Sequence, residues 1–199
     1  MSFTLFRCRF TISLPFAALL ALLLLFDRTG VMPLDLAAVF LHEAAHFLAM
    51  RAFGQSPSSV DLKIGRIQIK KPPSMTYWQE MVISAAGAGA NLLSTLISGF
   101  IYLVMPFHPL LLFAAVNLFV GLFNLLPVNG LDGGRILRLA LALRSETADQ
   151  NTAVNVLSAA VILLLIACGL AQGRGNPTLL IFGVYLLILL MMSRKNTEL

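Results

Sequence analysis

The sequence is poor in charge. Only 12% of its 199 residues are Asp, Glu, Lys or Arg, whereas 58% are hydrophobic and the mean hydropathy is +0.87. Soluble domains carry about a quarter charged residues, and this much apolar surface cannot be hidden inside one globule of this size. The composition therefore excludes an ordinary soluble domain and indicates a protein whose solvent is the lipid bilayer.

Cysteine is equally scarce. The two cysteines, Cys8 and Cys168, have neither the number nor the spacing of a disulfide framework or of a cysteine-based metal site. The sequence also lacks internal repeats and low-complexity linkers. We therefore expect two free thiols and a single domain spanning 1–199.

Long apolar runs fill the chain instead. A helix that crosses a bilayer needs roughly 20 mostly apolar residues, and the runs predict an all-α polytopic membrane protein with about six transmembrane helices. A signal peptide is the alternative for the first run, but no small-residue cleavage signature follows it. The expected core is 34–143, and the expected flanking spans are 10–26, 152–170 and 177–192.

Basic residues lie in the short stretches between these runs, and the net charge is +5. If the chain crosses six times, the basic stretches share one side, so the positive-inside rule predicts that both termini are cytoplasmic. Attraction to anionic lipid explains the same charges, and a nucleic-acid partner is not expected. The stretches contain Arg7 and Arg9; Lys63, Arg66, Lys70 and Lys71; Arg135, Arg138 and Arg144; and Arg194 and Lys195.

The sharpest motif is His42-Glu43-Ala44-Ala45-His46. Histidines four apart on a helix share a face and lie about 6 Å apart, which suits two ligands of one zinc ion. Glu43 can then take a proton from a zinc-bound water. Chance would produce this pattern in about one such chain in a thousand, and ionisable residues inside a span usually mark function. A packed hydrogen-bonded cluster is the alternative.

A catalytic zinc ion needs a third protein ligand. The remaining histidine, His108, falls in a short connection on the opposite side, whereas Asp132 follows a segment that Pro127 and Gly130 break. Such broken backbone is tolerated at membrane depth only where protein or a watery cavity satisfies it. We therefore favour Asp132 as the third ligand, with a helix N-cap as its alternative role.

The two motifs together, HEAAH at 42–46 and NLLPVNGLDGG at 124–134, resemble those of the site-2 protease family of intramembrane metalloproteases. The compact six-span form is similar to the sporulation-type members that process membrane-tethered pro-sigma factors. The resemblance covers about 34–143 and implies a zinc endopeptidase of a bacterial cell membrane, with one Zn²⁺, a membrane-tethered protein substrate and a regulatory membrane partner. It implies that His42, His46 and Asp132 bind the metal, that Glu43 is the catalytic acid/base and that Asn124 holds the substrate or the oxyanion.

A third family motif, AGPxxN, is matched in part at 86–91, where Ala88 replaces the proline. The resemblance implies that Asn91 lies near the site and contacts the substrate. Gly87 and Gly89 belong either to this site or to a plain helix-packing face.

Residues 60–70 alternate apolar and polar side chains on either side of Gly65. This pattern predicts a short β-hairpin or strand pair at the cytoplasmic face. An edge strand there could pair with an unwound substrate, and a basic loop that touches lipid is the alternative.

Three other functions remain open from the sequence. A catalytically inactive membrane scaffold would share the fold, and an ion or solute transporter would use the broken helix for permeation. A zinc enzyme with a glutamate as third ligand would need Glu80, Glu146 or Glu198.

Overall fold

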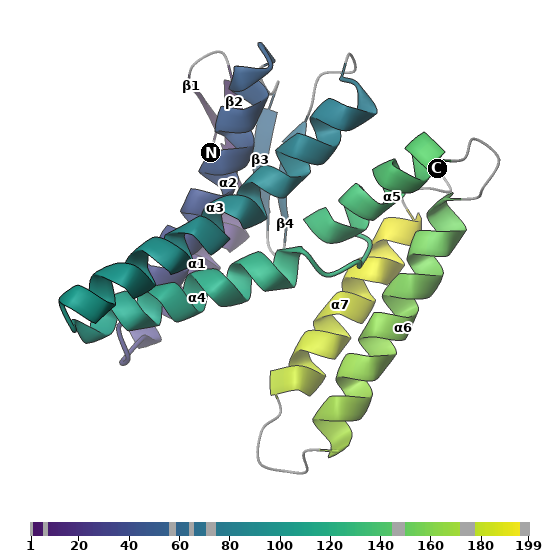
Figure 1. Cartoon of the computed structure of the whole chain (residues 1–199). Coiled ribbons are helices and arrows are strands. Elements are labelled where there is room, and N and C mark those ends of the chain that lie inside the picture. Colours follow the sequence, from purple (N-terminus) through teal and green to yellow (C-terminus); the bar gives the residue numbers. More distant parts are fainter. Residues whose placement is uncertain are drawn as a thin grey trace. The chain divides into compact units, whose positions relative to one another are not determined.

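A computed structural model describes residues 2–5, 8–55, 59–63, 66–70, 75–144, 150–171 and 178–195. Within these ranges the chain forms four strands and seven helices (Figure 1). It divides into two compact units, Met1–Gly121 and Leu122–Leu199.

The first unit contains a four-stranded sheet with the order β1-β2-β3-β4. β1 pairs with β2, and β3 with β4, in antiparallel fashion, whereas β2 and β3 are parallel. Parallel neighbours need a long crossover connection, and two helices supply it between β2 and β3. The strands are β1 Ser2–Leu5, β2 Cys8–Ile12, β3 Ser59–Lys63 and β4 Arg66–Lys70.

The start of the first helix differs from the prediction. Residues 10–12 belong to β2, where Phe10 lies opposite Val60, and α1 is Leu14–Phe26. A proline in the first turn pre-sets the helical backbone from this point, whereas the residues before it pair with β3. The β3–β4 pair occupies the segment for which the sequence predicts a hairpin, and its place at a membrane face stays a prediction.

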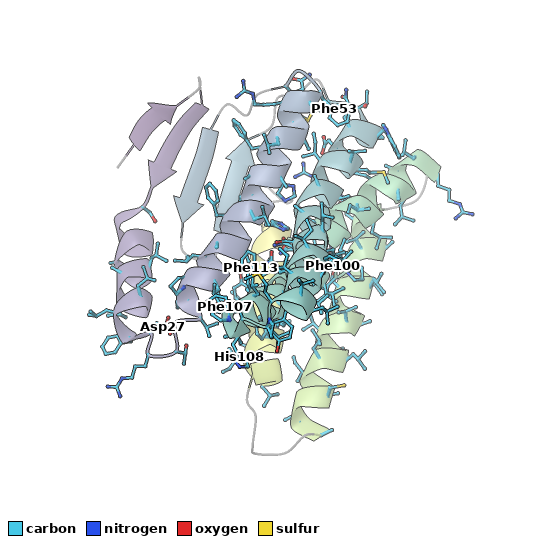
Figure 2. The ribbon with its side chains drawn as sticks, turned by 60° about the vertical axis from the view of Figure 1, so that its left-hand side comes forward. Asp27, Phe53, Phe100, Phe107, His108 and Phe113 are labelled. Carbon is cyan, nitrogen blue, oxygen red and sulfur yellow. The ribbon has the colours of Figure 1, made fainter. Side chains whose placement is uncertain are left out.

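Three longer helices complete the first unit and pass to the second: α2 Met32–Ala52, α3 Tyr77–Val104 and α4 His108–Asn124. Figure 2 shows Asp27 and His108 at one end of this unit and Phe53 at the other. His108 therefore lies at the end opposite to the one at which α2 finishes.

Length and apolar composition single out two described helices as able to cross a membrane, Tyr77–Val104 and Asn151–Ala171. The helix His108–Asn124 is apolar but shorter. On α3 the side chain of Leu103 is 80% exposed and that of Leu96 70%, which suits helices solvated by lipid. The count of six spans stays a prediction.

The second unit begins with a tight turn and continues with α5 Asp132–Arg144, α6 Gln150–Ala171 and α7 Thr178–Lys195. Gly130 has a φ of 105°, which favours glycine. A Cβ on Gly133 would collide with the Leu125 carbonyl oxygen, and one on Gly134 with that of Val128. The chain therefore folds back on itself so closely that only glycines fit at positions 133 and 134.

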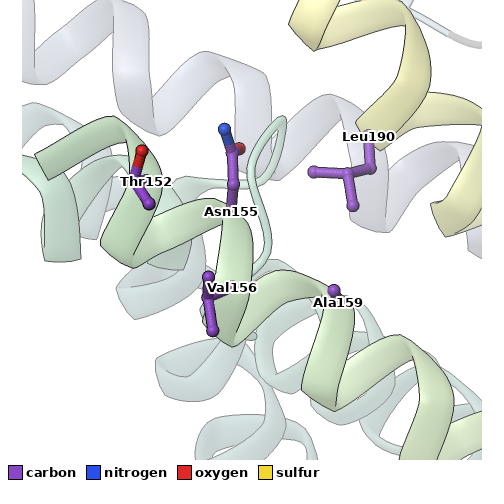
Figure 3. A pocket seen from close by; sticks show the side chains of 5 residues that line it. All are labelled: Thr152, Asn155, Val156, Ala159 and Leu190. Carbon is purple, nitrogen blue, oxygen red and sulfur yellow. The ribbon is translucent and has the colours of Figure 1, made fainter. Parts of the chain in front are cut away.

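An apolar core holds α6 against α7 in this unit. It consists of Val128, Ile162, Leu186 and Leu190, all buried. A cavity of about 140 Å³ lies beside it (Figure 3). Its lining residues are Thr152, Asn155, Val156, Ala159 and Leu190.

Candidate metal centre

The two histidines of the HEAAH motif lie together on the buried face of α2. Their spacing of four places them one turn apart on the same face, and only 4% of His42 and 8% of His46 is exposed. The Nε2 atoms are 3.1 Å apart, and the rings meet edge to face with their centroids 4.7 Å apart.

The outer nitrogen of each ring fixes where the ring proton lies. His42 Nδ1 is 2.7 Å from Asn91 Oδ1, and His46 Nδ1 is 2.7 Å from the carbonyl oxygen of Ile83. Both partners are oxygens that only accept, so both rings carry their proton on Nδ1 and donate it. Each Nε2 therefore presents a lone pair, as a metal-binding histidine does.

The two Nε2 atoms, 3.1 Å apart, are close enough for both to bind one divalent cation. The donor set, two neutral imidazoles anchored from behind, suits zinc. The residues present thus fit a metal ion.

Asn91 lies behind His42 and is completely buried. Its Nδ2 donates to the carbonyl oxygen of Ala38 at 3.0 Å and to Asn117 Oδ1 at 2.8 Å, and its Oδ1 accepts from His42. This side chain is one of those that the sequence singles out. Its described contacts are with the protein, and its predicted contact with a substrate stays a prediction.

Gly87 on α3 faces both imidazoles. A Cβ added there would lie 2.5 Å from His46 Nε2 and 2.7 Å from His42 Cε1, whereas one on Gly89 would meet nothing within 4 Å. Gly87 therefore belongs to the site, because any larger residue would displace the two rings.

Ser84 is a further residue near the site that was not predicted from the sequence. It lies one turn before Gly87 on α3 and is 1% exposed, and its Oγ has no hydrogen-bond partner among the described residues. An unpartnered buried hydroxyl costs about 1–3 kcal/mol, so it is the kind of group that a bound water or ligand satisfies. A small polar residue one turn before a functional glycine was the signal available.

The remaining predicted site residues are partly buried. Glu43 lies on α2 between the two histidines, Asn124 is the last residue of α4, and Asp132 is the first residue of α5. A carboxylate at a helix N-terminus is favoured by the helix dipole. Asn124 and Asp132 belong to the second unit and the other site residues to the first.

Comparison with known proteins agrees with this geometry. The model of the family described as Peptidase family M50 matches residues 104–167. The chain is 30% identical over 145 residues to sll0528 of Synechocystis and 32% identical over 147 residues to Rip3 of Mycobacterium tuberculosis, both described as zinc metalloproteases. These matches take in 70% and 69% of this chain but only 35% and 37% of the relatives, so the chain spans about a third of their length.

The fold matches a solved structure over almost the whole chain. It superimposes on the site-2 protease from Methanocaldococcus jannaschii with a TM-score of 0.70 and 18% sequence identity, covering 97% of this chain and 94% of that one. The fold is therefore the one seen in that membrane protease, and the paired histidines of α2 give it a candidate metal centre. Residues 104–167 of the chain are thus similar to peptidase family M50, and its fold is that of a site-2 protease.

Proposed function

We propose that this protein is an intramembrane zinc endopeptidase that hydrolyses peptide bonds of membrane-tethered proteins within or at the edge of the bilayer. The observation that carries the proposal is the buried pair His42 and His46, whose Nε2 atoms are 3.1 Å apart. The zinc metalloprotease relatives and the site-2 protease fold support it. They do not favour a scaffold or a transporter.

Asp132 is the third ligand in this proposal. Asp132 is the first residue of α5, and a carboxylate oxygen is a ligand that completes a zinc site built on two histidines. His108, the other histidine, lies at the end of the first unit away from Phe53. Three protein ligands leave a fourth position open for water, as hydrolysis requires.

Bound zinc would supply a Lewis acid and lower the pKa of the attacking water. Glu43 takes the proton of that water and later gives it to the leaving amine. Asn124 orients the scissile carbonyl through its amide. Asn91 and Ile83 hold the ring protons of the histidines away from the centre.

The site lies inside the membrane in this proposal, nearer the cytoplasm. His46 is seven residues before Phe53, which is about 10 Å along a helix. We propose that the whole chain, 1–199, acts as one multi-pass domain with about six spans, with both termini and the β3–β4 pair at the cytoplasmic face. The edge strand β4 could bind a substrate segment in extended form.

The charge-neutral substitution Glu43→Gln tests the enzymatic assignment. We expect it to retain zinc and to lower cleavage of a co-expressed single-span membrane protein by about 100- to 10,000-fold. Glu80→Gln, the same change at the start of α3, is the matched control and should cleave like the wild type. The assignment fails if Glu43→Gln cleaves at the wild-type rate, or if the wild-type protein contains no zinc.

A further inference from the structure

A chain of buried amides runs from α4 to the histidines. Asn117 on α4 and Asn91 on α3 are both completely buried, and their side chains are joined by a hydrogen bond. We propose that Asn117 is a positioning residue that fixes the orientation of the Asn91 amide and, through it, the tautomer in which His42 can bind metal. This inference rests on the proposed role of His42 as a zinc ligand.

Each link in the chain has a direction. Asn117 Nδ2 donates to the backbone carbonyl of Phe113 at 2.9 Å, so its Oδ1 is turned towards Asn91. Asn91 Nδ2 donates to that Oδ1 at 2.8 Å, so Asn91 Oδ1 is turned towards His42. Because the first acceptor is a backbone oxygen, which cannot exchange its role, the whole series has one favoured orientation.

The two histidines differ in how they are anchored. The acceptor for His46 is the backbone carbonyl of Ile83, which is an oxygen in every state of the protein. The acceptor for His42 belongs to a side-chain amide, whose oxygen and nitrogen exchange places when the group rotates by half a turn. His42 therefore needs a further contact that prevents this rotation.

If the Asn91 amide rotated by half a turn, His42 could no longer bind zinc through Nε2. The amide nitrogen would then face His42 Nδ1 and donate to it, so the ring proton would move to Nε2, the nitrogen that points at His46. A protonated Nε2 has no lone pair for zinc. In the observed state, rotation would turn Asn91 Oδ1 towards the oxygens of Ala38 and Asn117, which makes it unfavourable.

A purely structural role for Asn117 would be to join α3 to α4. Thr95 already makes such a link without touching the Asn91 side chain, because its Oγ1 is 3.2 Å from the carbonyl oxygen of Ala114 and 3.0 Å from that of Asn91. Thr95→Val therefore removes a polar contact between the same two helices and leaves the amide chain intact. It is the matched control for Asn117.

The experiment measures zinc affinity of the purified full chain by competition with a chelator, together with the absorption spectrum of the cobalt-substituted protein. We expect Asn117→Leu to weaken zinc binding by about 10- to 100-fold, as loss of an outer-shell partner does, and to alter the cobalt spectrum. Thr95→Val should match the wild type.

The outcomes separate this inference from the proposed function. If the wild type binds no zinc, the proposed function fails. If the wild type binds zinc and Asn117→Leu binds it equally well, or if Thr95→Val weakens binding as much, only the role of Asn117 is wrong. Asn117→Ala, which removes the amide without adding bulk, replaces the leucine variant if that variant does not fold, with the same expected loss.

Discussion

The helix pairs α2–α3 and α6–α7 bury very different side chains. The face of α3 buries Ser84, Gly87 and Asn91, and α2 buries two histidines. The pair α6–α7 instead buries Ile162, Leu186 and Leu190. In a lipid environment both pairs must be held by packing and hydrogen bonds rather than by exclusion of water. The α2–α3 pair, with its polar and glycine-containing core, is thus the pair that contains the histidines of the candidate metal centre.

Polar groups inside the second unit have a different use. Ser158 on α6 accepts from the backbone nitrogen of Asn129 at 2.8 Å and donates to the carbonyl of Val154 at 2.6 Å. Asn155 accepts from Asn129 Nδ2 at 3.0 Å. These contacts satisfy the broken backbone ahead of α5, which would otherwise be unpaired. Buried polarity therefore orients imidazoles in the first unit and holds a turn in the second.

The largest effect in this comparison is expected from Gly87→Ala. The added methyl group would overlap both imidazoles, so we expect zinc affinity to fall by about 100-fold or more, beyond the loss that outer-shell changes give. Chelator competition on the purified protein measures it. Gly89→Ala, two residues along α3 in open space, should bind zinc normally, and an equal loss in both variants would refute the assignment of Gly87 to the site.

A smaller effect, on stability, is expected from serine substitutions. Ser158→Ala leaves the partly buried Asn129 N–H without its acceptor, so the free energy of unfolding should fall by about 1–3 kcal/mol while zinc affinity is unchanged. Ser84→Ala is the same substitution in the other pair. It removes a hydroxyl that has no described partner, so stability should not fall. Thermal unfolding in detergent compares the two variants. An equal loss of stability in both would show that the hydroxyls of Ser158 and Ser84 do not differ in this way.

Local spacing explains how much of the site the sequence predicts. Helix geometry alone places His42 and His46 on the same face of α2. The adjacent glycines at 133 and 134 indicate that the backbone is approached closely by residues only a few positions away. For Gly87 the sequence left two roles open, as part of the site or as a helix-packing residue. The family resemblance placed Asn91 near the site, but local spacing could not predict its hydrogen bond to His42, 49 residues away, or that of Asn117 to Asn91, 26 residues away.

The fold, too, could be predicted only where a local sequence pattern encodes it. The helices of the second unit follow apolar runs that the sequence displays directly, and α6 and α7 include most of the predicted 152–170 and 177–192. The strand β2 was missed, because residues 10–12 are apolar enough to extend the helix behind them. Their parallel pairing with β3 depends on a segment about 50 residues away, and no local pattern encodes such a partner.

The smallest effect is expected from Asp27, at the exposed turn between α1 and α2. Its carboxylate accepts hydrogen bonds from the Thr29 hydroxyl and from the backbone nitrogens of Thr29, Gly30 and Met32. These bonds, the Thr29 hydroxyl first, lower the pKa of Asp27 below its usual 3.8. A lowered pKa means that the ionised carboxylate stabilises the folded state above pH 3.8, and that this stabilisation is lost as the pH falls through the lowered value.

We therefore expect Asp27→Asn to lower the Tm slightly at pH 7 and to have no effect at a pH below the lowered pKa of Asp27, where the wild-type carboxyl is also protonated. Thr29→Val should raise the pKa of Asp27 and shift the loss of stability to higher pH, because it removes the strongest of the hydrogen bonds. Zinc affinity should not change in either variant, since Asp27 lies at the end of the unit opposite Phe53. An equal fall in Tm at both pH values would show that the turn depends on shape rather than on charge.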